Sequence, residues 1–264
     1  MTSKISSNNS THTILLKWGI LLKITPLIGL FCLGKWTFHL MKWEIGKFDP
    51  QIGSLFATVA FLLAFMLSAA MLDYRLSEEM PNSIAIAVET IQDTNLMIAA
   101  RHSEYNSIPL TEGLVDILST TLICLQEYKS FISVEDVVTS LNPLLVPLSK
   151  FCEAPLMARI QGEQGKIRFT IAQIKRIRDT DFLPASYALQ YILLIISTMT
   201  LLVTHTDEFF TNLIVSGFLF TAITYVILLI HDIDNPFEFN GRSSVDVTLL
   251  PLEKSYQRLR AGLL

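Results

Sequence analysis

The sequence has little charge for its length. Only 17% of its 264 residues are charged, whereas soluble proteins average about a quarter. It has no long basic run, and its formal net charge is -4, so nucleic acid is not an expected partner. Hydrophobic residues make up 51% of the chain. This balance excludes an ordinary soluble domain and indicates an integral membrane protein.

Signatures of covalent and catalytic chemistry are missing as well. The three cysteines, Cys32, Cys124 and Cys152, lie far apart and form neither a disulfide framework nor a zinc-binding spacing. There is no glycine-rich phosphate loop, no His-Glu-x-x-His pair and no nucleophile elbow. We therefore expect no catalytic residue, no cofactor and no metal, and the sequence does not predict an enzyme.

Long uncharged runs are what the sequence does contain. At about 1.5 Å per residue, Ile52–Leu72 is long enough to cross a hydrocarbon core of about 30 Å as a helix. Tyr187–Val203 and Leu213–Ile230 are two further runs of this kind. They predict three transmembrane helices.

The first hydrophobic region is interrupted by lysines. A span over Ile14–Leu33 would bury Lys17 and Lys23, and a lysine at a helix centre costs about 2.5–3.5 kcal/mol. A span over Ile24–Met41 leaves both lysines at the interface and encloses only Lys35, which is close enough to the far end to snorkel. The preceding stretch, ILLKWGILLK, is then predicted to be an interfacial helix. The total is four spans.

The distribution of lysine and arginine predicts the orientation. With four spans, the N-terminus, the long middle segment and the C-terminus share one side. Most basic residues near the spans lie on that side: Lys17, Lys23, Arg75, Lys166, Arg168, Lys175, Arg176, Arg178 and Arg242. The first loop on the other side holds three lysines, which weaken the contrast. We predict both termini in the cytoplasm, with the protein in the inner or plasma membrane.

The middle segment is too polar to span and is predicted to be helical. Apolar residues recur at helical spacing in Ile84–Ile98 and in Leu114–Ile132, whereas Pro143 and Pro147 are expected to break the next stretch. The fold class is therefore all-α. The predicted parts are a disordered tail (1–13), an interfacial helix with two spans (14–74), a cytosolic helical region (75–183), two spans (184–231) and a cytosolic tail (232–264).

Four stretches, in this order, resemble the bestrophin family. They are LLKWGILLKI at the first span, ATVAFLLAFMLSAAMLDYRLSEE at the second, RIRDTDFLPASYALQY at the third, and HDIDNPFEFNG with LLPLEKSYQRL after the fourth. The last resembles the acidic-x-x-Asp-Pro-Phe motif of the family, although Asn235 stands where bestrophins usually have an aspartate. The middle segment matches in length and helical character only.

The resemblance implies a homopentameric ion channel with one axial pore lined by the second span. Its expected partners are further copies of itself, the lipid bilayer and monovalent ions, with chloride or other anions favoured and cations left open. A function of another class also fits the sequence: a membrane-embedded interaction or scaffold protein whose middle helices bind a partner.

Ala57, Phe61 and Phe65 lie four residues apart on one face of the second span. By the resemblance, these positions match the hydrophobic neck of the pore. A ring of aromatic side chains can close a pore by dewetting and can present its positive edges to an anion. The periodicity by itself favours lipid contact or packing within the bundle.

Two acids follow the second span. Asp73 and Glu78 are candidates for charged rings in a cytosolic vestibule, where they would favour cations. An ordinary solvated helix exit would carry the same residues.

The fourth span ends in a compact turn formed by Asp232, Asp234, Asn235, Pro236 and Phe237. Pro236 prevents the helix from continuing and pushes the preceding residue toward extended geometry. We expect the acids to end the span at the headgroup boundary and Phe237 to dock onto the cytosolic helices.

Calcium-gated bestrophins carry an acidic cluster after Pro-Phe. Here only Glu238 and Asp246 follow, with Arg242 between them. A calcium ion takes six to eight oxygen ligands, usually from several carboxylates, so we expect no calcium site.

The middle segment is also expected to contribute to assembly. The apolar content of Ile84–Ile98 and Leu114–Ile132 exceeds what one thin helical layer would hide. We therefore expect it to pack between neighbouring subunits.

Overall fold

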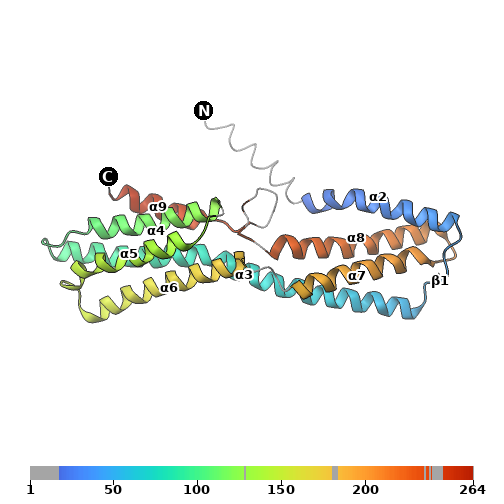
Figure 1. The fold of residues 1–264 in the computed structure, drawn as a ribbon, viewed down its shortest axis with the longest axis horizontal. Coiled ribbons are helices and arrows are strands. Elements are labelled where there is room, and N and C mark those ends of the chain that lie inside the picture. Colours follow the sequence, from blue (N-terminus) through green and yellow to red (C-terminus); the bar gives the residue numbers. More distant parts are fainter. Residues whose placement is uncertain are drawn as a thin grey trace, which may run out of the picture. The chain divides into compact units, whose positions relative to one another are not determined.

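The computed structural model describes residues 18–127, 129–179, 184–234, 236–237, 239 and 246–263. The chain is almost entirely helical and divides into two compact units (Figure 1). Of the described residues, unit 1 holds those up to 73 and 184–234, and unit 2 holds 74–179, 236–239 and 246–263. The all-α prediction is confirmed, with one short parallel strand pair, β1 (Gly46–Lys47) with β2 (Thr204–His205).

Unit 1 consists of long apolar helices. They are α2 (Gly19–Leu40), the first part of α3 (Pro50–Arg101), α7 (Pro184–Val203) and α8 (Phe209–Asp234). Phe31 of α2 stacks on Phe220 of α8 with ring centroids 4.5 Å apart. The rest of the core is aliphatic and aromatic: Phe56, Val59, Leu63, Leu201, Ile223 and Ile227.

Helix α2 differs from its prediction. It runs without a break from Gly19 to Leu40, so the predicted boundary between an interfacial helix and a span at Ile24 is wrong for the described part of the chain. The Lys23 side chain is exposed on the outer face of this helix. Its charge therefore stays outside the bundle and does not force the helix to end.

Five described helices are long and apolar enough to cross a membrane, by length and composition: α2, α3, α4 (Ile108–Gln126), α7 and α8. Four of them contain the four predicted spans. Helix α4 differs from the other four, because 56% of its most apolar window is buried inside the protein, against 17–33% for the others. Its apolar surface is thus largely covered by its own bundle.

Unit 2 is a bundle of the second part of α3 with α4, α5 (Ile132–Ser149), α6 (Ala154–Asp179) and α9 (Leu250–Ala261) (Figure 1). A buried polar network joins α3 to α4. The Tyr105 hydroxyl donates to Asn95 Oδ1 at 2.6 Å, and Asn95 Nδ2 donates to Thr111 Oγ1 at 3.2 Å. Because buried polar groups need partners, this network fixes how the two helices align.

Helix α5 continues through both of its prolines, so the predicted break at Pro143 and Pro147 is wrong. Both side chains are exposed. The carbonyl groups that lose a helical partner therefore lie on the outer face, where water can satisfy them.

The apolar runs of the middle segment are buried in part by the chain itself. Ile84, Ile91, Leu114 and Ile117 each have 0% exposure within the core of unit 2. Five helices around one core hide this part of the apolar surface, where the sequence suggested a thin layer. Other apolar residues of the two runs stay exposed: Ile86, Leu96, Met97, Ile123 and Ile132. The packing of this segment between neighbouring subunits stays a prediction.

Candidate functional site

The predicted neck residues lie on the outer face of α3 in unit 1. Ala57 is exposed, and the Phe61 and Phe65 side chains are 71% and 70% exposed. The opposite face of the same helix carries Phe56 and Val59, which are 7% and 1% exposed and belong to the unit 1 core. Packing within the chain, one of the alternatives for these phenylalanines, is therefore wrong. In a membrane, lipid or another subunit has to cover them.

The residues around these two rings are small. The exposed positions beside them on α3 are Ala57, Thr58, Ala60, Ala64, Ser68 and Ala69. The Thr58 hydroxyl donates to the Ser54 carbonyl at 2.9 Å, so it is satisfied within its own helix. The face is thus mostly apolar. Among the described residues, Phe61 and Phe65 are its aromatic side chains, and Leu72 is a further bulky side chain near its end. If several copies turned this face to one axis, these two rings would form the narrowest levels.

The acids after the second span are both exposed. Asp73 belongs to unit 1 and Glu78 to unit 2. Within unit 2, the Tyr74 hydroxyl donates to Glu78 Oε1 at 3.1 Å. Burial raises the pKa of Tyr74 to about 12, and the hydrogen bond to Glu78 acts in the same direction. Tyr74 therefore remains a neutral donor at physiological pH and holds the Glu78 carboxylate in place.

The two acids at the end of α8 have different surroundings. Helix α8 ends at Asp234, whose carboxylate accepts a hydrogen bond from the Tyr187 hydroxyl of α7. The Tyr187 ring also lies 4.5 Å from the His231 ring. Asp232 is half-buried. The end of α8 is thus tied to α7 through Asp234.

Pro236 and Phe237 belong to unit 2. The Val247 amide donates to the Pro236 carbonyl at 2.9 Å, and the Phe237 side chain is fully buried in the unit 2 core. Asn235 lies outside the described residues, as do Glu238 and Arg242. Within the described part of the chain, no three His, Cys, Asp or Glu side chains gather as a metal site would require.

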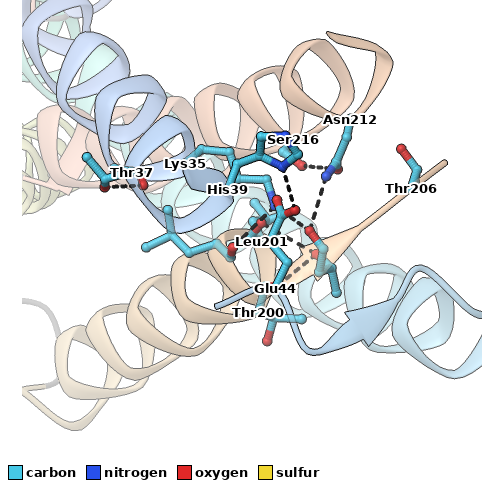
Figure 2. Close-up of polar contacts among 12 residues, drawn as sticks. Lys35, Thr37, His39, Glu44, Thr200, Leu201, Thr206, Asn212 and Ser216 are labelled. Atoms are coloured by element: carbon cyan, nitrogen blue, oxygen red, sulfur yellow. Dashed lines mark hydrogen bonds and ion pairs between the residues drawn. The ribbon is translucent and has the colours of Figure 1, made fainter. Parts of the chain in front are cut away.

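A buried lysine is the strongest polar feature of unit 1, and its role was missed in the sequence. The Lys35 side chain has 0% exposure and forms an ion pair with Glu44 at 3.0 Å (Figure 2). It also donates to the Leu202 carbonyl at 3.2 Å and to the Thr204 carbonyl. Snorkelling would leave the ammonium group open to water, whereas here it is enclosed by protein at the end of α7 and the loop after α2.

Three oxygens surround the Lys35 ammonium group. It donates hydrogen bonds to the two carbonyl groups and has Glu44 Oε1 as its ion-pair partner. Glu44 also contacts His39 Nδ1 at 2.9 Å. Burial raises the pKa of Glu44, but the hydrogen bonds from His39 and Lys35 outweigh it and hold that pKa below its ordinary value. Glu44 is thus ionised at neutral pH and neutralises the buried lysine.

Helix α8 joins the same network (Figure 2). Asn212 Nδ2 donates to the Thr204 carbonyl at 3.1 Å, and the Ser216 hydroxyl donates to Asn212 Oδ1 at 3.1 Å. Lys35 therefore links α2, the loop holding Glu44, the end of α7 and the start of α8. Because the Lys35 side chain is enclosed by these contacts, it ties the four segments together and is not open to a passing anion. A lysine inside an apolar run, followed by an acid in the next loop, was the available signal.

Comparisons with known proteins find likeness in structure and none in sequence. No protein-family profile matches the chain, and no curated protein matches it. A crystal structure of a bacterial bestrophin homolog from Klebsiella pneumoniae matches with a TM-score of 0.75 at 13% identity, covering 92% of this chain and 100% of that chain. A second structure of such a homolog has a TM-score of 0.67 at 14% identity, with 95% and 98% covered.

A third structure, described as that of a membrane protein, has a TM-score of 0.67 at 13% identity and covers 94% of this chain and 97% of its own. At such low sequence identity, the matches establish the fold alone. They span nearly the whole of each chain. The resemblance first drawn from four short stretches is thereby confirmed at the level of the fold: the chain has the bestrophin fold.

Proposed function

We propose that the chain is one subunit of a homopentameric ion channel whose pore is lined by the outer face of α3 in unit 1. The observation that carries this proposal is the exposure of Phe61 and Phe65, 71% and 70%, on a helix whose opposite face is core. The bestrophin fold supports it, because the family that the sequence resembles consists of ion channels with this helix at the axis.

The physical role of the face is a hydrophobic neck. An ion that enters a ring of phenylalanines loses hydrating water and gains no polar replacement, which is costly. The small side chains around Phe61 and Phe65 leave these two levels as the main barrier. Flux then depends on whether the neck holds water.

We propose four spans: α2, the first part of α3, α7 and α8. Helix α4 is long and apolar enough to be a fifth, but its buried apolar window and its polar contacts to α3 favour a place in a water-exposed bundle. Unit 2 and both termini then lie in the cytoplasm, as the distribution of basic residues indicates.

The proposed permeant species is a monovalent ion. The family resemblance favours chloride or another anion, whereas Asp73 and Glu78, if they face the pore, favour cations. The resemblance and the two acids thus favour ions of opposite charge. The reversal potential across an ion gradient distinguishes an anion current from a cation current.

The test is reconstitution of the purified protein in planar bilayers with a tenfold gradient of one salt. We expect a conductance whose reversal potential moves toward the equilibrium potential of the permeant ion. Replacing first the anion and then the cation by a large organic ion identifies which one carries the current. An assembled oligomer with no conductance under any gradient would contradict the proposal and favour the scaffold function.

A further inference from the structure

Helix α6 carries an unusual outer face for a water-exposed helix. Phe169 is 63% exposed in unit 2. Its exposed neighbours on the same face include Gly162, Gly165 and Ala172, and a Cβ added at either glycine would meet nothing within 4 Å. A single aromatic ring that projects from a row of small residues allows another helix to approach closely. Phe169 is therefore a knob in the sense of helix packing, and nothing in its own chain covers most of it.

A matching hole lies on another part of the same unit. A groove of about 400 Å³ opens between α3 and α9, with Ile86 and Leu250, 48% and 49% exposed, in its lining. Three of the polar groups within it are paired with one another: Glu89 binds Arg258 at 3.0 Å and accepts from the Ser255 hydroxyl at 2.7 Å. The groove thus offers an apolar contact through Ile86 and Leu250 beside polar groups such as Asn82 and Lys254.

The knob and the groove lie on opposite edges of the unit 2 bundle. Helix α6 packs on α5, whereas α9 packs on α4, and Figure 1 shows α6 and α9 on opposite sides of the other helices. A knob on one edge and a hole on the other make a heterologous contact, the kind that closes into a ring. One chain cannot fill its own groove in this way.

The two features lie at the same level along the bundle. Hydrogen bonds align Gln92 and Asn95 with Thr111, Cys124 with Ser133, and Val138 and Asn142 with Gln164. Counting along α4, α5 and α6 from these pairs puts Phe169 within about one helical turn of the level of Asn82 in the groove lining. Rotation about an axis parallel to the helices preserves that level, so a neighbouring copy presents its ring at the right height.

Charge supports the same partner. Arg159 and Arg176 flank Phe169 on α6, and Glu79 and Asp93 flank the groove on α3; all four are exposed. Because α6 runs antiparallel to α3, Arg176 of one copy lies toward Glu79 of the next, and Arg159 toward Asp93. Opposite charges on both sides of an apolar knob fix register as well as attraction.

We propose that Phe169 of each copy inserts into the α3–α9 groove of the next copy around the ring. The occupant of the groove is thus a second copy of this chain, and the inference rests on the proposed homo-oligomeric channel. It assigns the contact between subunits in unit 2 to Phe169, which lies outside the apolar runs that the sequence indicated, and to a groove whose lining includes Ile86 of the first run.

Disulfide trapping in the full-length protein tests the contact. In a background with Cys32, Cys124 and Cys152 changed to alanine, Phe169→Cys is combined with Asn82→Cys in one variant and with Ile86→Cys in another. Mild oxidation is expected to give a ladder of covalent oligomers from at least one pair and none from any single variant. Ile132→Cys, at a position on α5 that is 61% exposed, replaces Phe169→Cys in the control pairs and is expected to give no ladder.

A second measurement covers the case in which the cysteine variants do not assemble. Phe169→Glu in the otherwise unchanged chain is expected to shift the mass distribution in mild detergent from oligomer to monomer, whereas Ile132→Glu leaves it unchanged. An intact oligomer with Phe169→Glu, or the absence of a ladder from both cysteine pairs when both variants assemble, would overturn this contact and leave the channel proposal standing. A wild-type chain that is monomeric would overturn both.

Discussion

At the scale of single residues, unit 1 reverses the usual burial preferences of two residue types, phenylalanine and lysine. Phe61 and Phe65 are exposed, and Lys35 is completely enclosed. Both arrangements fit a membrane protein. An exposed ring costs little where lipid or a partner subunit replaces water, and a charge inside the membrane has to be paired. The contacts of Lys35 with Glu44 and two carbonyl groups supply that pairing.

The first prediction concerns the neck. Changing both Phe61 and Phe65 to alanine widens the ring and lets water remain, so ion flux into liposomes should rise at least several-fold. Because both rings are exposed on the subunit, their loss leaves no cavity in its core. Phe56→Ala, on the buried face of the same helix, is the matched control and should cost about 3–5 kcal/mol of stability without raising flux.

Unchanged or lower flux from an assembled double alanine variant would contradict the pore-lining role of this face. Ala57→Phe is the complementary change. It should reduce flux if position 57 faces a pore, and it should be nearly silent if that position faces lipid.

The second prediction concerns the ion pair of Lys35. Lys35→Met removes the ammonium group that is paired with Glu44 and leaves that carboxylate only its contact with His39. Breaking a buried pair in this way costs about 3–5 kcal/mol. The thermal unfolding midpoint of the purified protein should fall accordingly. Combining Lys35→Met with Glu44→Gln removes both charges and should restore much of the loss. If the double variant were no more stable than Lys35→Met alone, the two groups would not be coupled.

The same pair predicts a dependence on pH. The folded-state pKa of Glu44 lies below its ordinary value of 4.5, so its contribution to stability is present above that value and is lost as pH falls through the folded pKa. The stability difference between the wild type and Glu44→Gln should therefore be full at pH 7 and shrink below about pH 4.5. Thermal unfolding of both proteins across this range measures it, and a constant difference would contradict the assignment.

At the scale of helices, the sequence predicted which segments are helical better than it predicted where the helices begin and end. The uncharged runs in α3, α7 and α8 were identifiable because nothing in them opposes a span. The predicted interruptions at Lys23, Pro143 and Pro147 failed for a common reason. All three side chains are exposed, and a charge or a missing donor on an outer face does not end a helix that is packed on its other side.

The connection after α8 combines a helix end with a docking residue. Asp234 ends the helix while bound by Tyr187, and Phe237 is buried in the core of unit 2. The proline signalled the end of the helix from sequence. The identity of the residues that receive Phe237 required tertiary contacts, since they come from segments distant in the chain.

The third prediction tests this docking. Phe237→Ala should cost about 3–5 kcal/mol, because it empties a fully buried aromatic site. Phe239→Ala, two residues later at a half-buried position, is the control and should cost clearly less. Thermal unfolding compares the two, and equal losses would mean that Phe237 does not anchor the turn.

At the scale of the whole molecule, the order of four short stretches was enough to indicate the bestrophin fold. Assembly was a different matter. Several apolar residues that sequence assigned to neighbours, such as Ile84 and Leu114, fill the core of unit 2 instead. Periodicity identifies an apolar face and does not say which helix covers it. The two carbonyl groups that accept from Lys35 could not be predicted either, because Leu202 and Thr204 lie far along the chain.

The fourth prediction concerns calcium. The segment after Pro-Phe carries only Glu238 and Asp246, separated by Arg242, which is too few oxygens for a calcium ion. Conductance should therefore be insensitive to micromolar calcium on the side of unit 2. Solutions buffered with chelator provide the titration, and a steep rise of current in this range would contradict it.

The central claim is that several copies surround one axis with α3 innermost. An electron-microscopy reconstruction of the full-length protein in lipid nanodiscs tests it most directly. We predict a five-fold axis with the first part of α3 closest to it and density for Phe61 and Phe65 pointing at the axis. A particle without a rotational axis, or a ring in which these two side chains face lipid, would contradict the account.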